Sequence, residues 1–375
     1  MRMRTATIAF GGFVILGLPT GMLGIAWPSI RTDLDAPLAG LGIVLAAMTV
    51  AMFGSSAVSG IVRQRFGTIA LLLVPTALSA GGLLLFTVAQ TWPTIILAAA
   101  VLGAGLGLLD AAFNTEAALR RGIRFMAALH ASWAVGATLG PALIGLVLVA
   151  AGSWRPGYAV AALAFVAFAV ATYLVRGDLA RTPESDDAPI ATRGARGVAV
   201  MGAALMFVYV GIELGAGQWS FTRLIADGAL TDVVAGLAVF LYWSALATGR
   251  IALALFGARV PAERLIDLSV GGTFASALAF WILPPPIAAL VALPSIGLSL
   301  SVFVPVLLYL IPRRVGRAAA PHVIGYLVAA GMIGGAVLPA AIGLVLQSTG
   351  VSNLGICLSA LAATFGVLHI AAGGR

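Results

Sequence analysis

The chain has 375 residues, of which 61% are hydrophobic and only 9% are charged. Soluble domains carry about 25% charged residues, so the composition excludes a soluble enzyme and predicts an integral membrane protein. The net charge of +8 comes from arginines in short segments between apolar runs, which indicates membrane topology rather than nucleic-acid binding. One cysteine and three scattered histidines predict no disulfide framework, no metal site and no cofactor.

The apolar runs are long enough for helices that cross a bilayer, which takes about 20 residues. They lack the ten-residue alternation of an outer-membrane barrel. We therefore expect an all-α integral membrane protein with twelve transmembrane helices, at about residues 6–30, 38–62, 68–90, 93–118, 125–152, 157–176, 198–226, 232–258, 265–283, 287–311, 320–347 and 352–371. The long polar stretch in the middle predicts a six-helix bundle (1–176), a cytoplasmic linker (177–197) and a second six-helix bundle (198–375).

The arginines also predict the orientation, because cytoplasmic loops are enriched in basic residues. With the N-terminus inside, 17 arginines fall on the cytoplasmic side, whereas Arg31, Arg155 and Arg223 fall outside. We expect a monomeric, multi-pass protein of the inner (plasma) membrane with both termini in the cytoplasm.

The fourth span carries a carboxylate, Asp110, near the middle of its apolar run. Helical spacing places Gly103, Gly107, Asp110 and Asn114 on one small, polar face. An ionised Asp at mid-membrane costs about 2.5–3.5 kcal/mol, so it needs a proton, a partner or a water-filled cavity. We interpret Asp110 as a proton-binding group that faces an internal pathway. A hydrogen bond that locks two helices together is the alternative.

Titratable groups follow on the cytoplasmic side of Asp110. Glu116 points to another face of the same helix, where we expect a pair with Arg120 at i+4, and a role in a gate is the alternative. In the fifth span, His130 could relay protons because its ordinary pKa is near neutral, or it could simply pack. Trp133 lies one turn further along.

The seventh span carries a second mid-membrane carboxylate, Glu213, among Gly211, Gly215 and Gly217. Such a glycine cluster permits a close helix contact or a broken helix, as at transporter sites. A carboxylate whose protonation depends on conformation and bound solute is what proton coupling requires. We assign Glu213, with Asp110, to proton coupling. A substrate or gating contact and a structural hydrogen bond are the alternatives.

Arg250 lies within the eighth span, about nine residues from its cytoplasmic end. It could snorkel to the membrane interface, or it could pair with a buried carboxylate. Asp267 at the start of the ninth span is expected to pair with Arg259 or Arg264, and His369 is expected to have no particular role.

Aromatic side chains suit a sugar, because an apolar ring packs on the sugar while polar groups hold its hydroxyls. The candidates are Trp133, Trp219, Tyr242 and Trp243, with Gln218 and Asn114 as hydrogen-bonding partners. Trp27, Trp92 and Trp154 lie at span ends and are interpreted as anchors at the membrane interface, an interpretation that Trp219 also allows.

The two halves repeat. The segment 133–145 (WAVGATLGPALIG) resembles 331–343 (GMIGGAVLPAAIG) at a constant offset of 198, so that Gly136 and Pro141 match Gly334 and Pro339. A repeat in a twelve-span chain implies two similar bundles with a solute site between them near the midplane.

Twelve spans, a central linker and this repeat resemble the major facilitator superfamily. The segment 60–67 (GIVRQRFG) resembles the family's loop between spans 2 and 3, G-x-L-x-D-R-x-G-R-K. Gly60, Arg65 and Gly67 match, whereas Gln64 replaces the Asp and the basic pair is missing. The resemblance implies that Arg65 belongs to a charge network that is incomplete here.

The fourth, fifth and seventh spans together resemble the fucose permease-like branch of that family. In this branch a span-4 carboxylate, followed four residues later by Asn, is tied to proton coupling and sugar binding. The matching residues here are Asp110 and Asn114. The segment 136–145 (GATLGPALIG) instead resembles the span-5 pattern of export antiporters, with Ile144 in place of a Gly.

We therefore predict a proton-coupled secondary transporter that works by alternating access, with uptake of a small polar solute such as a sugar by symport. The alternative is a proton-driven antiporter that exports amphipathic compounds or drugs. The partners are a small-molecule solute, protons and the lipid bilayer.

Overall fold

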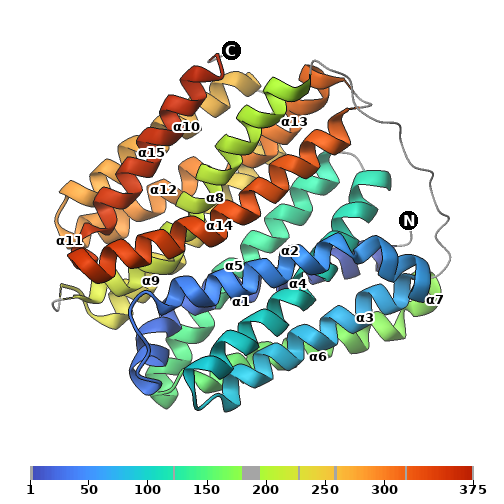
Figure 1. Cartoon of the computed structure of the whole chain (residues 1–375), viewed down its shortest axis with the longest axis horizontal. Coiled ribbons are helices and arrows are strands. Elements are labelled where there is room, and N and C mark those ends of the chain that lie inside the picture. The colour runs from blue at the N-terminus through green and yellow to red at the C-terminus, as the bar shows by residue number, and fades with distance from the viewer. Residues whose placement is uncertain are drawn as a thin grey trace. The chain divides into compact units, whose positions relative to one another are not determined.

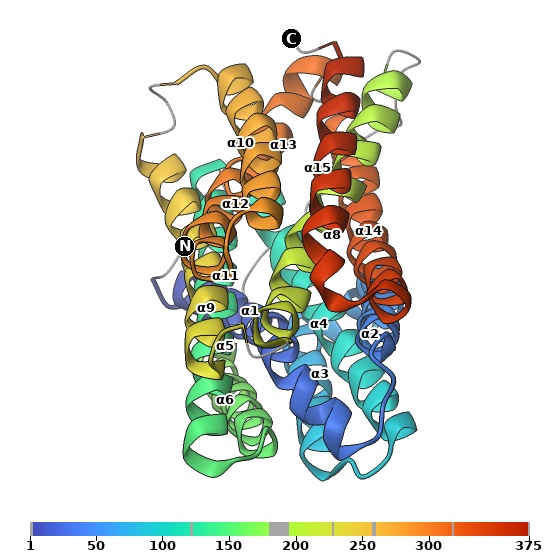
Figure 2. The same ribbon diagram turned by 90° about the vertical axis from the view of Figure 1, so that its left-hand side faces the viewer.

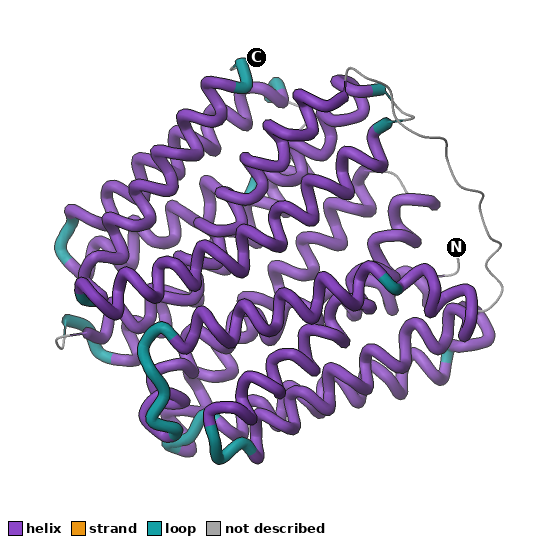
Figure 3. Tube along the Cα trace, in the orientation of Figure 1, coloured by secondary structure: helices purple, strands orange, loops and turns teal. Residues whose placement is uncertain are grey.

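The chain folds almost entirely into helices, as a computed structural model shows (Figure 1, Figure 3). The structure describes residues 3–120, 123–179, 195–226, 229–256, 260–316 and 319–373. In these ranges twelve helical segments are long and apolar enough to cross a membrane, and no strand occurs. The helical form follows from the lipid environment, because every backbone N–H and C=O in a bilayer core must find its partner within the segment.

Two compact units divide the chain, Met1–Ser185 and Asp186–Arg375. Most of the predicted linker, residues 180–194, lies outside the described ranges. The first unit contains α1 (Met3–Asp33), α2 (Gly40–Ala57), α3 (Ser59–Val88), α4 (Trp92–Arg120), α5 (Ile123–Ala151), α6 (Arg155–Leu174) and the short α7 (Arg176–Leu179).

The second unit begins with α8 (Ala195–Ile225), α9 (Asp232–Phe256) and α10 (Ala262–Ile282). The tenth span is assembled from α11 (Pro285–Ile287), a π-helical turn (Ala288–Ala292), α12 (Leu293–Leu300) and α13 (Phe303–Val315). The unit ends with α14 (Ala320–Thr349), a 3₁₀ turn (Val351–Asn353) and α15 (Leu354–Ala371).

Helices pair in the same pattern in both units. In the first unit α1 packs on α5, α2 on α4, and α3 on both α4 and α6. In the second unit α8 packs on α14, α9 on α12, and α10 on both α12 and α15. The pairing of α10 with α15 is visible along their length in Figure 2. The two halves of the sequence repeat therefore occupy equivalent helices, α5 and α14.

Glycines explain why the repeat is preserved at particular positions. A Cβ atom on Gly136 of α5 would overlap the carbonyl oxygen of Val14 in α1, and one on Gly334 of α14 would overlap that of Phe207 in α8. A side chain at either position would push the backbones apart, so glycine permits their close approach. Gly103 of α4 and Gly297 of α12 make the same kind of contact, with the carbonyls of Met48 and Tyr242.

The segment predicted as a loop between the second and third spans is helical instead. Backbone hydrogen bonds continue from Ser59 to Phe66, and the chain changes direction at Gly67, where φ is 79° and ψ is 173°. This left-handed region is open to glycine without a steric penalty. Glycine at this position of the motif therefore has a conformational reason.

A broken helix occurs in the tenth span rather than in the seventh. The helix α8 runs without interruption through Gly211, Gly215 and Gly217, whereas the tenth span is interrupted at Ser301 and Val302. Pro305 contributes to the break because it has no N–H to close the turn on Ser301. Serine side chains bind backbone carbonyls there: the hydroxyl of Ser269 donates to Ser299 O at 2.6 Å, and that of Ser301 to Leu298 O at 2.6 Å.

Candidate functional site

Asp110 lies in α4 with its side chain partly accessible. It shares a hydrogen bond with the side chain of Asn114, one helical turn further along. Among the side chains that the structure describes, which do not include those of Arg120 and Arg124, no basic group forms an ion pair with its carboxyl group. Among the described side chains, it is therefore a neutral amide that binds the carboxyl group of Asp110.

The glycines on the same helix face have a packing role that the sequence left open. A Cβ atom on Gly107 would overlap the carbonyl oxygen of Met52 in α2, as one on Gly103 would that of Met48. The hydroxyl of Ser56 in α2 also donates to the Gly107 carbonyl at 2.8 Å. The part of this face that Gly103 and Gly107 form is therefore covered by α2.

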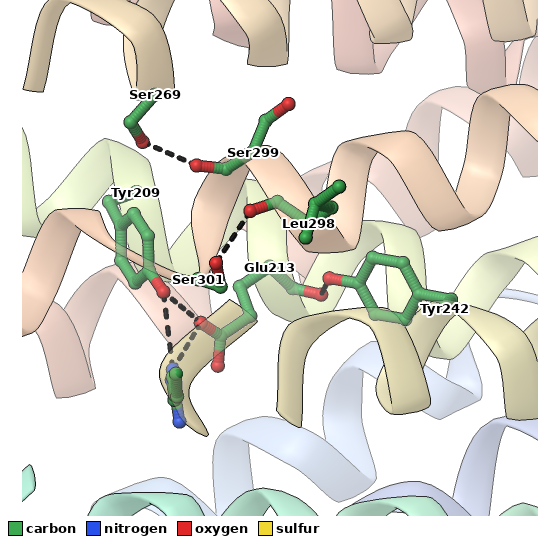
Figure 4. Close-up of polar contacts among 8 residues, drawn as sticks. Tyr209, Glu213, Tyr242, Ser269, Leu298, Ser299 and Ser301 are labelled. Atoms are coloured by element: carbon green, nitrogen blue, oxygen red, sulfur yellow. Dashed lines mark hydrogen bonds and ion pairs between the residues drawn. The ribbon is translucent and has the colours of Figure 1, made fainter. Parts of the chain in front are cut away.

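Glu213 lies in α8 and is 5% exposed. Arg250 of α9 donates from Nη2 to its Oε2 at 3.2 Å, and the two side chains are each 6% exposed. The hydroxyl of Tyr209, one turn before Glu213 on α8, donates to the same oxygen. Arg250 Nη2 also donates to Tyr209 Oη at 3.3 Å, so three polar groups close a triangle (Figure 4).

This triangle is fixed by its surroundings. The ring of Tyr209 stacks on Phe303 at the start of α13, with centroids 5.2 Å apart, and Phe303 in turn packs edge-on against Phe365 of α15. The hydroxyl of Tyr242 donates to the backbone carbonyl of Glu213 at 2.7 Å (Figure 4). Removal of one partner of a buried ion pair leaves an uncompensated charge. Substitution of Glu213 or Arg250 alone should therefore destabilise the fold.

Of the two alternatives for Arg250, the structure shows the pair with a buried carboxylate. Proton coupling through Glu213 stays a prediction, and the geometry supports the alternative of a structural or gating contact. Tyr209 was absent from the sequence prediction, although its i, i+4 spacing to Glu213 was visible.

The predicted sugar-binding aromatics of the second unit are buried. Trp219 is fully buried and donates from Nε1 to the carbonyl of Pro339 at 2.9 Å. Trp243 packs edge-on against Tyr242 and closely against Gly217. Gln218 is 1% exposed. In this conformation these side chains offer no surface to a solute, so the structure gives their predicted role no support.

The two candidates of α5 remain partly accessible. His130 packs edge-on against Phe13 of α1, with ring centroids 5.8 Å apart, and its side chain is neither buried nor fully exposed. Trp133 is likewise intermediate in exposure. With Asn114, these are the residues of the substrate-binding prediction that retain accessible surface.

Tryptophans at span ends do not act as interface anchors in two of three cases. Trp27 and Trp154 are fully buried. Trp27 packs edge-on against Trp92, whereas Trp154 donates from Nε1 to Asp33 at 2.8 Å. Arg155 forms an ion pair with the same carboxylate at 2.6 Å. These indoles therefore tie helices together, and the prediction of anchoring is wrong for both.

The structure describes the side chains of only some of the remaining charged residues. Arg65 is exposed at the end of the helical segment before Gly67. The side chains of Glu116 and Arg120 lie outside the description, so their pair stays a prediction. Asp267 binds His369 Nε2 at 2.7 Å, so His369 joins α10 to α15, a role that the sequence did not predict. Arg259, one of the two arginines expected to pair with Asp267, lies outside the described residues, so that pair stays a prediction.

Comparisons with known proteins agree with this architecture. The model of the Major Facilitator Superfamily matches residues 9–339. An uncharacterized MFS-type transporter of Yersinia pestis is 23% identical over 373 residues, covering 94% of this chain and 91% of that protein. A sodium-dependent glucose transporter 1A of Mus musculus is 24% identical over 140 residues, 36% of this chain and 33% of that one.

Solved structures share the fold at lower identity. A D-xylose-proton symporter superposes with a TM-score of 0.77 at 15% identity, covering 99% of both chains. The nucleoside transporter NupG superposes with a TM-score of 0.76 at 13% identity, covering 99% of this chain and 98% of that one.

Proposed function

This chain belongs to the major facilitator superfamily, and we propose that it is a proton-coupled transporter that takes up a small polar solute, such as a sugar, by alternating access. Family membership makes it a multi-pass membrane transporter rather than an enzyme. The arginine distribution favours both termini in the cytoplasm. A monomer in the inner membrane is part of the same proposal.

The observation that carries the proposal is the environment of Asp110. It is an acidic side chain in the middle of a membrane-spanning helix, partly accessible and bonded to a neutral amide. Such a group can exchange a proton when the access to it changes, and a bound solute can alter that exchange. Glu213 differs in that Arg250 and Tyr209 both bind its carboxylate.

The solute class rests on the likeness to the fucose permease-like branch in the fourth, fifth and seventh spans. The names of a xylose symporter and a glucose transporter among similar proteins are in keeping with a sugar. The glycine pattern of the fifth span, which resembles that of exporters, is accounted for by the contact of Gly136 with α1 and gives export no separate support.

Solute-driven pH change in proteoliposomes tests the proposal. An inward sugar gradient should make the external medium more alkaline in the wild type, and Asp110→Asn should abolish this change while solute exchange continues. Asp232→Asn, at an exposed carboxylate that begins α9, is the matched control and should behave as wild type. Coupling that survives in Asp110→Asn, or that requires sodium in place of protons, would sink the proposal.

Outward movement of amphipathic dyes driven by protons, without sugar flux, would instead select the antiporter. Assays in whole cells distinguish the two functions: one measures the uptake of labelled sugars, and the other measures the efflux of cationic dyes.

A further inference from the structure

A groove in the second unit lies apart from the acidic residues discussed above. It has a volume of about 380 Å³ and is formed by α9, α10, α12 and the break that follows α12. Its lining includes Leu253, Phe256, Leu268, Leu298 and Ser301. This volume is at the lower end of the range for small-molecule sites.

The chemistry of the lining favours an apolar occupant. Most of the lining side chains are aliphatic or aromatic. The serine hydroxyls are already engaged at two positions, because Ser269 donates to Ser299 O and Ser301 donates to Leu298 O (Figure 4). A polar solute would lose its hydration here and gain few hydrogen bonds, whereas a hydrocarbon chain would lose nothing.

The rim of the groove faces lipid. Leu268 is 67% exposed, and Leu298 and Phe256 are each 53% exposed. In a chain that spans a bilayer, apolar side chains with this exposure lie against acyl chains. The groove is therefore open to the bilayer, where hydrocarbon is the solvent.

Charge at one end of the groove favours a particular headgroup. Phe256, the last residue of α9, and Leu265, in the second turn of α10, both line it, so the groove reaches the end of the unit that the arginines predict to be cytoplasmic. Arg264 is exposed and directly precedes Leu265, although the exposed Glu263 is its neighbour. An arginine at the cytoplasmic end of a membrane-spanning helix attracts the anionic lipids of that leaflet.

We propose that the groove binds an anionic phospholipid of the cytoplasmic leaflet, with one acyl chain between α9, α10 and α12 and its phosphate at Arg264. Gly249 and Ser301 form part of the lining, so the acyl chain would lie against the break in the tenth span, beside the residue that precedes Arg250. A lipid in this position fills the space beside the break, where α12 and α13 would otherwise be less supported.

Lipid retention by the purified full-length chain tests this proposal. Native mass spectrometry would follow the binding of phosphatidylglycerol and phosphatidylcholine with identical acyl chains. Ala252→Phe, which fills the groove from α9, should weaken both lipids. Arg264→Gln should weaken phosphatidylglycerol about fivefold and leave phosphatidylcholine unchanged.

Matched controls separate the site from the rest of the lipid-facing surface. Ala363→Phe places the same side chain at an exposed alanine of α15 outside the groove, and Arg196→Gln removes an exposed arginine from the start of α8. Both should retain lipid as the wild type does. Equal retention in Ala252→Phe and Ala363→Phe would overturn the proposal, as would equal binding of phosphatidylglycerol by Arg264→Gln and Arg196→Gln.

The arginine variants alter exposed side chains, so they decide the question even where the larger side chain at Ala252 impairs folding. A cationic amphipathic dye that occupies the groove, with no phospholipid displaced, would also overturn the proposal.

Discussion

Asp110 and Glu213 are carboxylates within membrane spans, one in each unit, and they have different partners. Asp110 in α4 is partly accessible and shares a hydrogen bond with an amide side chain of its own helix. Glu213 in α8 is buried against Arg250 of α9 and a tyrosine hydroxyl. Depth in the membrane is thus a poor guide to function. The partner decides whether an acidic group can exchange its proton or serves to join two helices.

The close helix contacts of α4 with α2 in the first unit recur between α12 and α9 in the second, but the residues that make them differ. Four residues after Gly103, Gly107 of α4 faces the hydroxyl of Ser55 in α2. Four residues after Gly297, the glycine is replaced by Ser301, which faces Gly249 in α9. Glycine and serine have exchanged helices while the close approach is preserved. The repeat therefore conserves backbone distance and leaves each unit free to carry its own polar chemistry.

Removal of Arg250 should give the largest change in stability. Arg250→Met leaves the Glu213 carboxylate buried without its cation, which costs about 3–5 kcal/mol in the free energy of unfolding. The double variant Glu213→Leu with Arg250→Met should recover most of this loss, whereas Asp110→Asn should cost little. Chemical denaturation in detergent micelles measures all three. A double variant as unstable as Arg250→Met would contradict the account of a matched pair.

Loss of one hydroxyl should have the next largest effect. Tyr209→Phe keeps the stack on Phe303 and removes the bonds to Glu213 and Arg250, which we expect to cost about 1.5–3 kcal/mol. Tyr158→Phe is the matched control, because the buried hydroxyl of Tyr158 has no hydrogen-bond partner among the described residues. Unfolding measurements that give equal losses for both tyrosines would show that the triangle adds nothing.

Because both units have close backbone contacts at equivalent glycines, a Gly→Ala substitution should lower the free energy of unfolding in each unit by a similar amount. Gly136→Ala and Gly334→Ala each force a methyl group against a carbonyl of the facing helix, at a cost of about 1–3 kcal/mol. Gly145 of α5 faces open space, so Gly145→Ala should be neutral or slightly stabilising. We would compare the unfolding free energies of the three variants. A neutral effect at Gly334 alone would break the equivalence of the units.

The smallest effect should come from the ion pair nearest to solvent. Arg155 and Asp33 have side chains that are 32% and 42% exposed, so solvent screens their attraction. Arg155→Gln should cost no more than about 1 kcal/mol in unfolding free energy. A loss as large as that of Arg250→Met would mean that burial does not explain the difference between the two pairs.

The helical architecture could be predicted from the sequence because hydrophobic run length and arginine placement are local signals. The repeat at Gly136 and Gly334 was also visible, although its cause, the carbonyls of Val14 and Phe207, was not. The partner of Arg250 lies 37 residues away on another helix, a pairing that no spacing rule gives.

Tertiary contacts explain the predictions that were wrong. Trp154 has an interfacial position in the sequence, but Asp33, 121 residues earlier, binds its indole. Next to the break at Ser301, the hydroxyl of Ser269 in α10 binds the carbonyl of Ser299, a contact between helices that the sequence does not show. Pro305 alone could not reveal the break, because prolines within α1, α5 and α14 leave those helices unbroken.

Infrared difference spectroscopy tests the central claim most directly, since the C=O stretch of a protonated carboxylic acid is distinct from the bands of a carboxylate. The sample is the purified protein in lipid vesicles, titrated with acid and base. We predict a titrating acid band in the wild type and in Glu213→Gln that is missing in Asp110→Asn. A band that persists in Asp110→Asn and vanishes in Glu213→Gln would contradict the account.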